Sequence, residues 1–395
     1  MRLSWRKLLR NSAAVFVLAT LVLSYLFLGQ YFGNNDSKRI FQDGPLVANS
    51  FQKSWHAPVH VQPTENDKSD ITSEKFSETQ LVRLKNGTPE YSFRKNDFFA
   101  PSKCPTSLQK KLARNPSTSE LFHPEIKQLL TSAGISRAEY QRLLIYWMPF
   151  GFKYHANFTY KELLQVLSLV PKDDSIFDYT GSQPRPECLS CAVVGNGGIL
   201  NGSRMGKEID SHDMVFRVNH CIRRGHEVDV GRRTTHLVLM DRSLRYTSAK
   251  DVPRDKGIKY VFMPCRKQDY GYIKDVATSS SRRLKLRGNA TDMRILHPDF
   301  IRYVHKMWEN TKSFRPTTGG MMFFTALHAG CDSISVYGMG FTKAYSEHYY
   351  DKDFKQYKTV KGSHDFKKEI EILRRLDQDG VIRWYKRDVA EFGAR

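Results

Sequence analysis

Two histidines near the C-terminal end of the sequence stand where they could move a proton. His364 comes directly before a predicted helix over residues 366–378. Because the positive end of a helix dipole disfavours an imidazolium, this ring should stay neutral and able to accept a proton, as a general base must. Glu369 would support the loop or the helix start, and His348 could donate a hydrogen bond to a leaving phosphate. A lone histidine is more often a surface or satisfied core residue, so neither carries this interpretation alone.

A glycine-rich turn follows a short apolar run in the middle of the chain. Residues 192–194 are predicted to form a strand and residues 195–198 the turn. Such a turn can leave backbone N–H groups open to an anion. Asn196 in the turn, and Asn219 at the end of the next predicted strand (213–219), could bind a nucleotide by hydrogen bonds without a metal. A single glycine turn is weak evidence, because many such turns hold no ligand.

A second pattern suited to an anion opens another predicted helix. Pro316-Thr317-Thr318-Gly319-Gly320 stands where a helix up to residue 329 would begin. Hydroxyl groups and free N–H groups at a helix N-terminus favour a phosphate or a carboxylate. An ordinary helix N-cap is the alternative, and it is the more common role of threonine at this position.

The elements that must hold these residues alternate along the chain. Apolar strand-like runs cover 192–194, 214–218, 235–240, 260–263, 295–296, 333–337 and 381–385. Helical runs are predicted at 121–130, 137–147, 162–169, 300–308, 319–329 and 366–378. Strands that alternate with helices predict an α/β fold with a mostly parallel sheet flanked by helices.

The N-terminal hundred residues are different in character. Basic residues precede an uncharged, mostly apolar run that is about long enough to cross a bilayer, and such charges keep their end in the cytosol. We therefore expect a cytosolic tail (1–10), a transmembrane signal anchor (11–32), a flexible polar stem (33–103) and a lumenal domain (104–395). A cleaved signal peptide is the alternative, but the bulky residues after the apolar run offer no clean cleavage site.

Cysteines, glycosylation signals and charge agree with a lumenal protein. The six cysteines allow three disulfides in fifteen pairings, and a zinc site at Cys188 and Cys191 is the alternative, although no second ligand pair accompanies it. Candidate N-glycosylation sites are Asn86, Asn157, Asn201 and Asn289. The net charge of +21 suggests anionic ligands, such as nucleotides, acidic glycans or membrane surfaces, or it serves mainly solubility. A lumenal position argues against nucleic acid as a partner.

Four ordered motifs resemble those of the animal sialyltransferases. Residues 191–241 resemble the large sialylmotif and 316–341 the small one, while His348-Tyr349-Tyr350-Asp351 resembles the third motif and His364-x₄-Glu369 the very small one. The resemblance covers about residues 104–387. The detailed similarity is to the N-acetylgalactosaminide α2,6-sialyltransferases, through the runs Val193–Asn201, Leu296–Phe300 and Ser346–Asp351.

This resemblance implies a function and a role for each motif. It implies a variant GT-A fold with a Rossmann-like sheet, a type II protein of the Golgi membrane, and inverting transfer of sialic acid from CMP-sialic acid to the 6-hydroxyl of GalNAc on O-glycans of glycoproteins. The residues that it places against CMP are Asn196, Asn219, Thr317, Thr318 and Gly319, with His348 at the phosphate and His364 as the base.

The same resemblance implies the disulfides and one irregularity. It pairs Cys191 with Cys331 and Cys104 with Cys188, which leaves Cys221 with Cys265. From the family pattern we expect one residue fewer before the cysteine of the segment 328–331, so the helix could end early at Gly330 or the disulfide could shift.

No cofactor or metal is expected, because a CMP donor has a single phosphate to neutralise. Asp351-Lys352-Asp353 and Asp377-Gln378-Asp379 have the Asp-x-Asp form of metal-dependent glycosyltransferases, but neither closely follows an apolar strand.

Other functions stay open at this point. A metal-dependent glycosyltransferase or a sulfotransferase is one alternative, although the turn at 195–198 lacks the cations that a phosphosulfate site needs. A lectin-like or scaffold protein is another, and the intact His348, His364 and Glu369 argue against it. A glycolipid or an N-glycan is the alternative acceptor.

Overall fold

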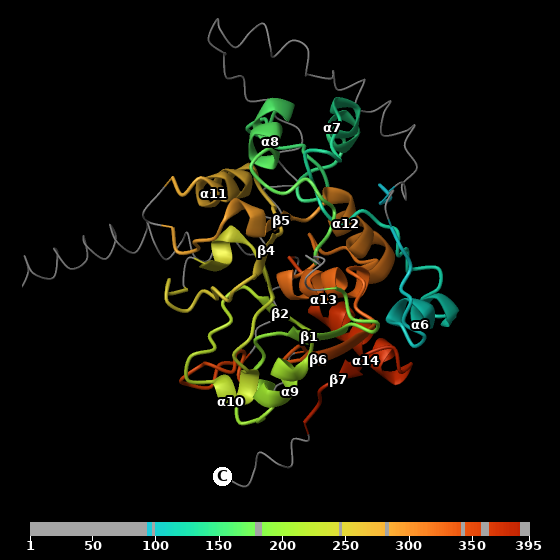
Figure 1. Cartoon of the computed structure of the whole chain (residues 1–395), viewed down its shortest axis with the longest axis vertical. Helices are drawn as coiled ribbons and strands as arrows, with labels where there is room; N and C mark the ends of the chain where they lie inside the picture. The colour runs from blue at the N-terminus through green and yellow to red at the C-terminus, as the bar shows by residue number, and fades with distance from the viewer. Residues whose placement is uncertain are drawn as a thin grey trace, which may run out of the picture. The chain divides into compact units, whose positions relative to one another are not determined.

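The computed structural model describes residues 93–96, 99–177, 184–244, 247–280, 284–340, 344–356 and 363–387 (Figure 1). The expected cytosolic tail, signal anchor and most of the stem, with Asn86, lie outside these ranges. Within them, no helix combines the length and apolar character that crossing a membrane requires. Residues 93–96, which the sequence assigned to the stem, contact the folded domain: the Arg94 N–H donates to Asp299 at 2.8 Å and Phe93 packs on Tyr303.

A parallel sheet forms the centre of the described chain, in the strand order β5-β4-β3-β2-β1-β6-β7 (Figure 1). Every neighbouring pair in this seven-stranded sheet is parallel. The strands are β1 (Ser190–Val194), β2 (Met214–Val218), β3 (His236–Leu239), β4 (Lys259–Phe262), β5 (Met293–Ile295), β6 (Ser333–Tyr337) and β7 (Arg383–Trp384). The prediction of a mostly parallel sheet flanked by helices is confirmed.

The strand order reverses beside β1. From β1 the chain adds β2 to β5 on one side of the sheet and then returns to add β6 and β7 on the other side. In open parallel sheets, the loops on either side of such a reversal diverge and leave a crevice at the carboxyl ends of the strands. The fold therefore points to the ends of β1, β2 and β6 as the place for a ligand.

Helices cover both faces of this sheet. The described helices are α6 (Leu108–Arg114), α7 (Arg137–Leu143), α8 (Tyr160–Leu167), α9 (Gly206–Ser211), α10 (Glu227–Val230), α11 (Lys267–Ala277), α12 (Pro298–Tyr303), α13 (Thr318–His328) and α14 (Phe366–Gln378). Short 3₁₀ turns η4 (Gly198–Leu200), η5 (Asp241–Leu244) and η6 (Ala290–Asp292) and a π-helical turn η7 (Val304–Glu309) complete them. One apolar cluster packs α6, α12, α13 and α14 against one face of the sheet. On the opposite face, a second cluster includes α7, α8 and α11, and a third includes α9 and α10.

Local sequence explains where the helices begin. Thr159 and Glu162 form a capping box at α8, Thr317 caps α13 and Asp365 caps α14. These side chains satisfy N–H groups that have no partner within the first helical turn. α13 is buried almost throughout, as a helix that packs against the middle of a sheet must be.

The predicted helix over 121–130 is wrong. This segment consists of turns, and the backbone of Leu129 pairs with Leu296 in an antiparallel bridge. Pro124 disfavours a helical conformation at His123, and the pairing at the sheet edge satisfies the backbone instead. The predicted helix at 300–308 begins earlier, as α12, and continues into the π-helical turn η7.

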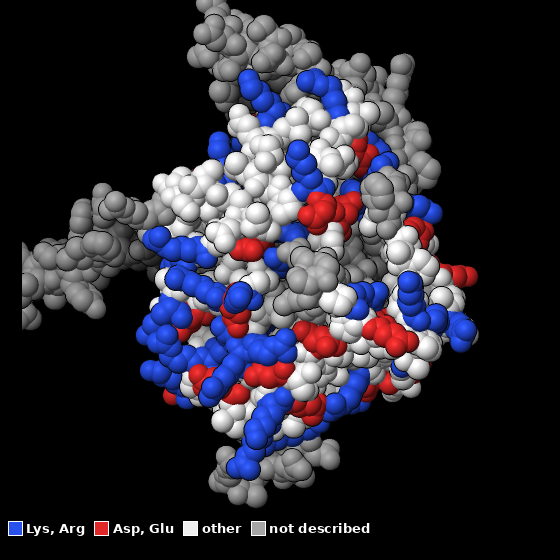
Figure 2. Space-filling view, viewed as in Figure 1, with Lys and Arg blue, Asp and Glu red and all other residues white. Residues whose placement is uncertain are grey.

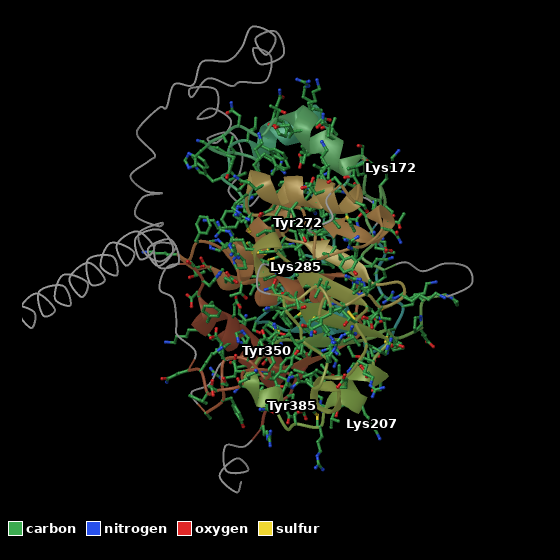
Figure 3. All side chains as sticks on the ribbon, turned by 90° about the vertical axis from the view of Figure 1, so that its left-hand side faces the viewer. Lys172, Lys207, Tyr272, Lys285, Tyr350 and Tyr385 are labelled. Carbon is green, nitrogen blue, oxygen red and sulfur yellow. A yellow bond between two sulfur atoms is a disulfide. The ribbon has the colours of Figure 1, made fainter. Side chains whose placement is uncertain are left out.

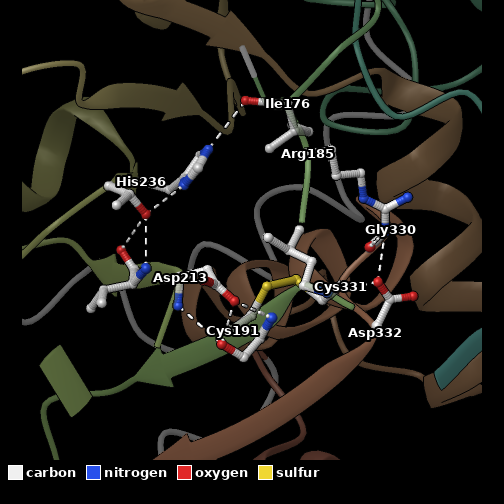
Figure 4. Close-up of a disulfide and its surroundings, with 12 residues drawn as sticks. Ile176, Arg185, Cys191, Asp213, His236, Gly330, Cys331 and Asp332 are labelled. Atoms are coloured by element: carbon white, nitrogen blue, oxygen red, sulfur yellow. Dashed lines mark hydrogen bonds and ion pairs between the residues drawn. A yellow bond between two sulfur atoms is a disulfide. The ribbon is translucent and has the colours of Figure 1, made fainter. Parts of the chain in front are cut away.

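The structure contains two disulfides, Cys104–Cys188 and Cys191–Cys331 (the latter in Figure 4). α13 ends at His328, and Gly330, with φ of +97°, turns the chain so that Cys331 still reaches β1. The disulfide that the resemblance implied is therefore formed in this segment.

The expected third disulfide, Cys221–Cys265, is not formed, and both thiols are buried and free. Cys221 follows β2 and Cys265 follows β4, with β3 between these strands. Two strand spacings separate the strands by about 10 Å, whereas disulfide-linked Cα atoms lie within about 7 Å. The two side chains also belong to clusters on opposite faces of the sheet.

Candidate active site

The two predicted asparagines lie together at the carboxyl ends of β1 and β2. The Asn196 side-chain amide donates to the Val218 carbonyl at 3.2 Å, and the Asn219 N–H donates to Val238 at 2.9 Å. Asn219 has φ of +50°, a left-handed conformation that asparagine tolerates better than most residues. The chain therefore turns at Asn219 directly beside the glycine turn.

The three glycine N–H groups of the turn are used within the protein. Gly195, Gly197 and Gly198 donate to the carbonyls of Tyr337, Gly338 and Ser346, at 2.8, 2.8 and 3.2 Å. A Cβ atom at Gly198 would lie 2.2 Å from the Ser346 oxygen. The expectation of an anion site at these three groups is wrong, because the glycines serve the close packing of the loops after β1 and β6.

One polar atom of the turn is left for a ligand. The Asn196 Oδ1 atom is buried and has no hydrogen-bond partner among the described residues. Buried polar atoms are nearly always paired, so an orphan at the crevice indicates a missing donor such as a ligand hydroxyl or amino group.

His348 is held by the loop that packs on this turn. The Tyr349 N–H donates to the Asn196 carbonyl at 3.0 Å, and the His348 ring stacks on Tyr350, with centroids 4.9 Å apart (Tyr350 is labelled in Figure 3). Asp351 Oδ2 accepts the His348 backbone N–H at 2.8 Å and lies 3.6 Å from its Nδ1 atom. Although burial opposes it, hydrogen bonds from Ser346 and the His348 N–H keep the pKa of Asp351 below its usual range. The carboxylate thus faces Nδ1 and leaves Nε2 for a ligand.

His364 is arranged as a base. Its Nδ1 atom lies 3.0 Å from the Arg315 carbonyl. Because a carbonyl only accepts, Nδ1 carries the hydrogen and Nε2 keeps a lone pair. Burial, with the Arg315 charge as a second cause, lowers the pKa of His364 to about 4. The ring is neutral at pH 7, as the sequence predicted, but burial rather than the helix dipole is the main reason.

The start of α13 combines a capped turn with unused N–H groups. Thr317 Oγ1 accepts from the Gly320 N–H at 2.8 Å and donates to Glu369 Oε2 at 2.7 Å, while the Thr317 N–H donates to Glu369 Oε1 at 2.8 Å. Thr317 is therefore the N-cap, and its hydroxyl is occupied. In the described structure, the N–H groups of Thr318 and Gly319 have no protein acceptor, so they are available to an anion.

A single side chain connects the glycine turn to the start of α13. A Cβ atom on Gly195 would lie 2.8 Å from Met339 Cγ, and one on Gly319 would lie 3.9 Å from Met339 Cε. The asparagines after β1 and β2 and the helix N-terminus therefore border one region.

Sequence reasoning missed two members of this region. Arg315 supplies a positive charge near His364 and Glu369, and its position directly before Pro316 and the helix start was the available signal. His220, next to Asn219, places its ring edge-on to Tyr350 at 5.7 Å. Nothing in the spacing of the motifs indicated that contact.

The two Asp-x-Asp segments are engaged with the protein. Asp351 accepts from Ser346 and the His348 backbone and pairs with Lys355, whereas Asp377 accepts from the Trp384 N–H and pairs with Lys386. Across the described ranges, no group of three or more histidine, cysteine or carboxylate side chains is placed to hold a metal ion.

A cavity of about 600 Å³ lies elsewhere. Its lining includes Lys127, Asp174, Arg185 and Gly330, and none of the residues that the sequence assigned to the site. Gly330 and Arg185 precede β6 and β1, so this cavity lies toward the amino ends of the strands.

Three of the candidate N-glycosylation sites are accessible at the protein surface. Asn157, Asn201 and Asn289 are all exposed. The Asn201 carbonyl accepts from Arg387 at 3.0 Å.

Comparisons with known proteins assign the chain to a family. Residues 129–381 match the family described as glycosyltransferase family 29 (sialyltransferase). The α-N-acetylgalactosaminide α-2,6-sialyltransferase 1 of Gallus gallus is 33% identical over 72% of this chain and 56% of its own length, and that of Homo sapiens is 33% identical over 72% and 52%. The α-N-acetylgalactosaminide α-2,6-sialyltransferase 2 of Homo sapiens is 30% identical over 72% of this chain and 83% of its own length.

The chain therefore spans little more than half the length of the first two relatives. The solved structure described as "Crystal Structure of a Mammalian Sialyltransferase" superposes with a TM-score of 0.57 at 24% identity, over 73% of this chain and all of that one, which shows that the fold is shared. Taken together, the match over residues 129–381 and these relatives establish that the chain belongs to glycosyltransferase family 29, the sialyltransferases.

Proposed function

We propose that this protein transfers sialic acid from CMP-sialic acid to the 6-hydroxyl of GalNAc on glycoprotein O-glycans. The observation that carries the proposal is the neutral His364, whose Nδ1–H is fixed on the Arg315 carbonyl so that Nε2 can accept a proton. Family membership supports the donor class, and the names of the relatives at 30–33% identity support the acceptor and linkage.

The mechanism follows from the groups that surround this base. His364 Nε2 removes the proton from the acceptor hydroxyl as its oxygen attacks the anomeric carbon of sialic acid. CMP leaves, and the growing charge on its phosphate is stabilised by His348, the Thr318 and Gly319 N–H groups and Arg315. One displacement inverts the anomeric configuration. Thr317 contributes by capping α13, while Asn196 and Asn219 bind the nucleoside through their amides.

The setting of the enzyme is part of the same proposal. A folded domain that already includes residues 93–96, carried on the preceding part of the stem and a signal anchor (11–32), would face the Golgi lumen as part of a type II membrane protein. Two disulfides, exposed glycosylation signals and a net charge of +21 support a lumenal enzyme with anionic substrates.

A donor and acceptor panel tests the activity directly. The full chain would be incubated with CMP-sialic acid, a nucleotide-diphosphate sugar or a phosphosulfate donor, each against GalNAc-peptide, Gal-GalNAc-peptide, ganglioside and N-glycan acceptors. We expect product only with CMP-sialic acid and GalNAc-containing peptides, with an α2,6 linkage by product analysis. Transfer to galactose, to lipid or from another donor would contradict the proposal.

Replacing the base separates chemistry from binding. His364→Ala should lower kcat by about 10²–10⁴-fold, the usual contribution of a general base, and leave the affinity for CMP close to that of the unmodified protein in calorimetry. His212→Ala, at the end of α9, is the control that should retain activity. A folded His364→Ala protein that loses CMP affinity together with activity would argue against the role.

Chelation tests the proposal that no metal is needed. A single phosphate, faced by Arg315 and a helix N-terminus, has less charge to neutralise than a pyrophosphate. Transfer measured in excess EDTA should proceed at an unchanged rate, and a strict requirement for a divalent cation would contradict this.

A further inference from the structure

Two buried carboxyl groups lie behind the first turn of α13. Glu309 ends the π-helical turn η7 and is 1% exposed, and Glu369 lies in the first turn of α14 and is 9% exposed. π-helical turns insert an extra residue and often occur at functional sites. Asn310 follows with φ of +43°, so the chain leaves the helix directly after Glu309.

Glu369 is held as the hydrogen-bond acceptor of this pair. Both of its oxygens accept from Thr317, at 2.8 and 2.7 Å. A Cβ atom on Gly320 would lie 2.9 Å from the Glu369 Cδ atom, so the carboxyl group is seated directly against the α13 N-terminus. The helix dipole and the nearby Arg315 both favour a negative charge there.

Among the described residues, Glu309 has no hydrogen-bond donor that would stabilise a negative charge on it. Neither of its oxygens receives a hydrogen bond from the described residues, and both are buried. Within the described part of the chain, the charges that act on its pKa are those of carboxyl groups, Glu369 and, on the approach to α14, Asp365. Two carboxylates in contact inside a protein cannot both be ionised without a large cost.

A proton on Glu309 removes the repulsion between the two carboxylates. Glu309 then donates to Glu369, and the hydrogen bond is satisfied at both ends. Burial, and next the adjacent Glu369, raise the pKa of Glu309 far above its usual range. Burial also raises the pKa of Glu369, but its hydrogen bonds to Thr317 and Glu309 act in the opposite direction. Both the hydrogen bonds and these opposing effects favour Glu309 as the protonated partner.

We propose that Glu309 is a protonated positioning residue, which donates a hydrogen bond to Glu369 and so holds Thr317 and the first turn of α13 in place for the CMP group of the donor. The inference rests on the proposed function for the identity of that ligand. Glu309 acts through Glu369 and Thr317 and does not touch the substrate.

Two replacements of similar volume test the hydrogen bond. Glu309→Gln keeps a donor without a proton to lose, and Glu309→Met keeps the volume without a donor. We expect the glutamine variant to match the parent protein in KM for CMP-sialic acid, and the methionine variant to raise that KM by about tenfold, the size of one hydrogen bond to a charged group. The KM for the acceptor should stay constant. Glu371→Gln, on the exposed side of α14, is the control for a carboxyl outside the pair.

The pH dependence separates positioning from packing. In the parent protein, donor KM should rise at alkaline pH as Glu309 ionises beside Glu369, and Glu309→Gln should remove this rise. A methionine variant equal to the glutamine variant would overturn the proposal, because packing alone would then explain the residue. A glutamine variant as impaired as the methionine variant would overturn it too, because Glu309 would have to be ionised.

Infrared spectroscopy on the parent protein needs no variant to fold. A full chain carrying ¹³C-labelled glutamate should show a protonated carboxyl band at pH 7 that persists well above the usual pKa of glutamate, and its absence would overturn the proposal. CMP binding by calorimetry distinguishes this from a failure of the proposed function. If the parent protein does not bind CMP, the function fails, whereas the infrared band still reports where the proton is.

Discussion

The direction of one hydrogen bond decides the chemistry of His364. The Arg315 carbonyl can only accept, so it selects the ring form whose free nitrogen is Nε2. The neighbouring guanidinium of the same residue disfavours a second proton. Backbone and side chain of Arg315 thus both favour a ring that accepts a proton from a bound alcohol.

The pH profile should reveal this environment. Because the pKa of His364 is lowered to about 4, the ring stays unprotonated far below the ordinary histidine range. We expect kcat/KM to stay level as the pH falls from about 7 to about 5.5 and to decrease only below that, whereas an unperturbed histidine would already lose activity near pH 6.5. Initial rates at saturating donor, with the acceptor well below its KM, provide the measurement across this range. An acid limb centred near pH 6.5 would mean that the ring is solvated in the working enzyme.

Residue identities could be predicted from the sequence more readily than their hydrogen bonds. The sequence indicated His364, Asn196 and Asn219 because each stands at the end of a strand or the start of a helix, and it indicated His348 through the family motif. It could not indicate that the N–H groups of the glycine turn would be used by the loop after β6, since that loop is about 140 positions away in the chain. Such contacts depend on which strands become neighbours.

At the scale of elements, the carboxyl ends of β1 and β6 are joined by backbone contacts that only glycine permits. A Cβ atom on Gly198 would meet the Ser346 carbonyl at 2.2 Å, and Ser346 is two residues before His348. The spacing between the two loops is therefore fixed by the main chain, and the position of His348 depends on it.

Two alanine substitutions should have opposite effects on stability. Gly198→Ala would force the loops apart and should destabilise the protein by roughly 1–3 kcal/mol, the range for overpacking, and reduce transfer as His348 moves. Gly271→Ala, inside α11 with open space around its Cα atom, should stabilise by about 0.5–1 kcal/mol. Thermal and denaturant unfolding would measure both. Equal effects at the two glycines would show that the close approach of the loops does not contribute to the free energy of unfolding.

The sequence predicted most elements because their apolar patterns are local. All of the predicted strand-like runs overlap strands of the sheet. α13 begins beside Thr317, which the sequence offered as an N-cap, and α14 covers the predicted range 366–378. The segment 121–130 failed because its apolar residues also fit a helix face. Pairing of Leu129 with Leu296, which no local pattern encodes, decided the outcome.

On the scale of the whole molecule, charge is unevenly spread. Basic side chains gather over α9 and α10 on the face in Figure 2. In the chain, the exposed basic residues in or beside these helices are Arg204, Lys207, Arg224, Arg232 and Arg233. The net charge of +21 therefore includes a local concentration of basic side chains. The sequence alone did not reveal it, because these residues are scattered along the chain.

The number of free thiols tests the disulfide pairing and the burial of the remaining cysteines. A chain denatured without reductant should contain two reactive thiols, Cys221 and Cys265, and a chain with the third disulfide would contain none. The native protein should react slowly, since both thiols are buried and burial raises the pKa of Cys265 to about 11. Thiol titration before and after denaturation, followed by peptide mapping, measures both states. Labelling at Cys104 or Cys331 would contradict the observed pairing.

The central place of β1 sets a condition on synthesis. β1 lies between β2 and β6, yet β6 and the disulfide partner of Cys191 leave the ribosome about 140 residues after it. For that interval, one edge of β1 is uncovered, and the Cys191 thiol can meet only cysteines that precede Cys331 in the chain, Cys188 and the two free cysteines among them. Correct pairing therefore requires that any bond formed earlier by Cys191 be reversible, or that its oxidation wait until translation has passed Cys331.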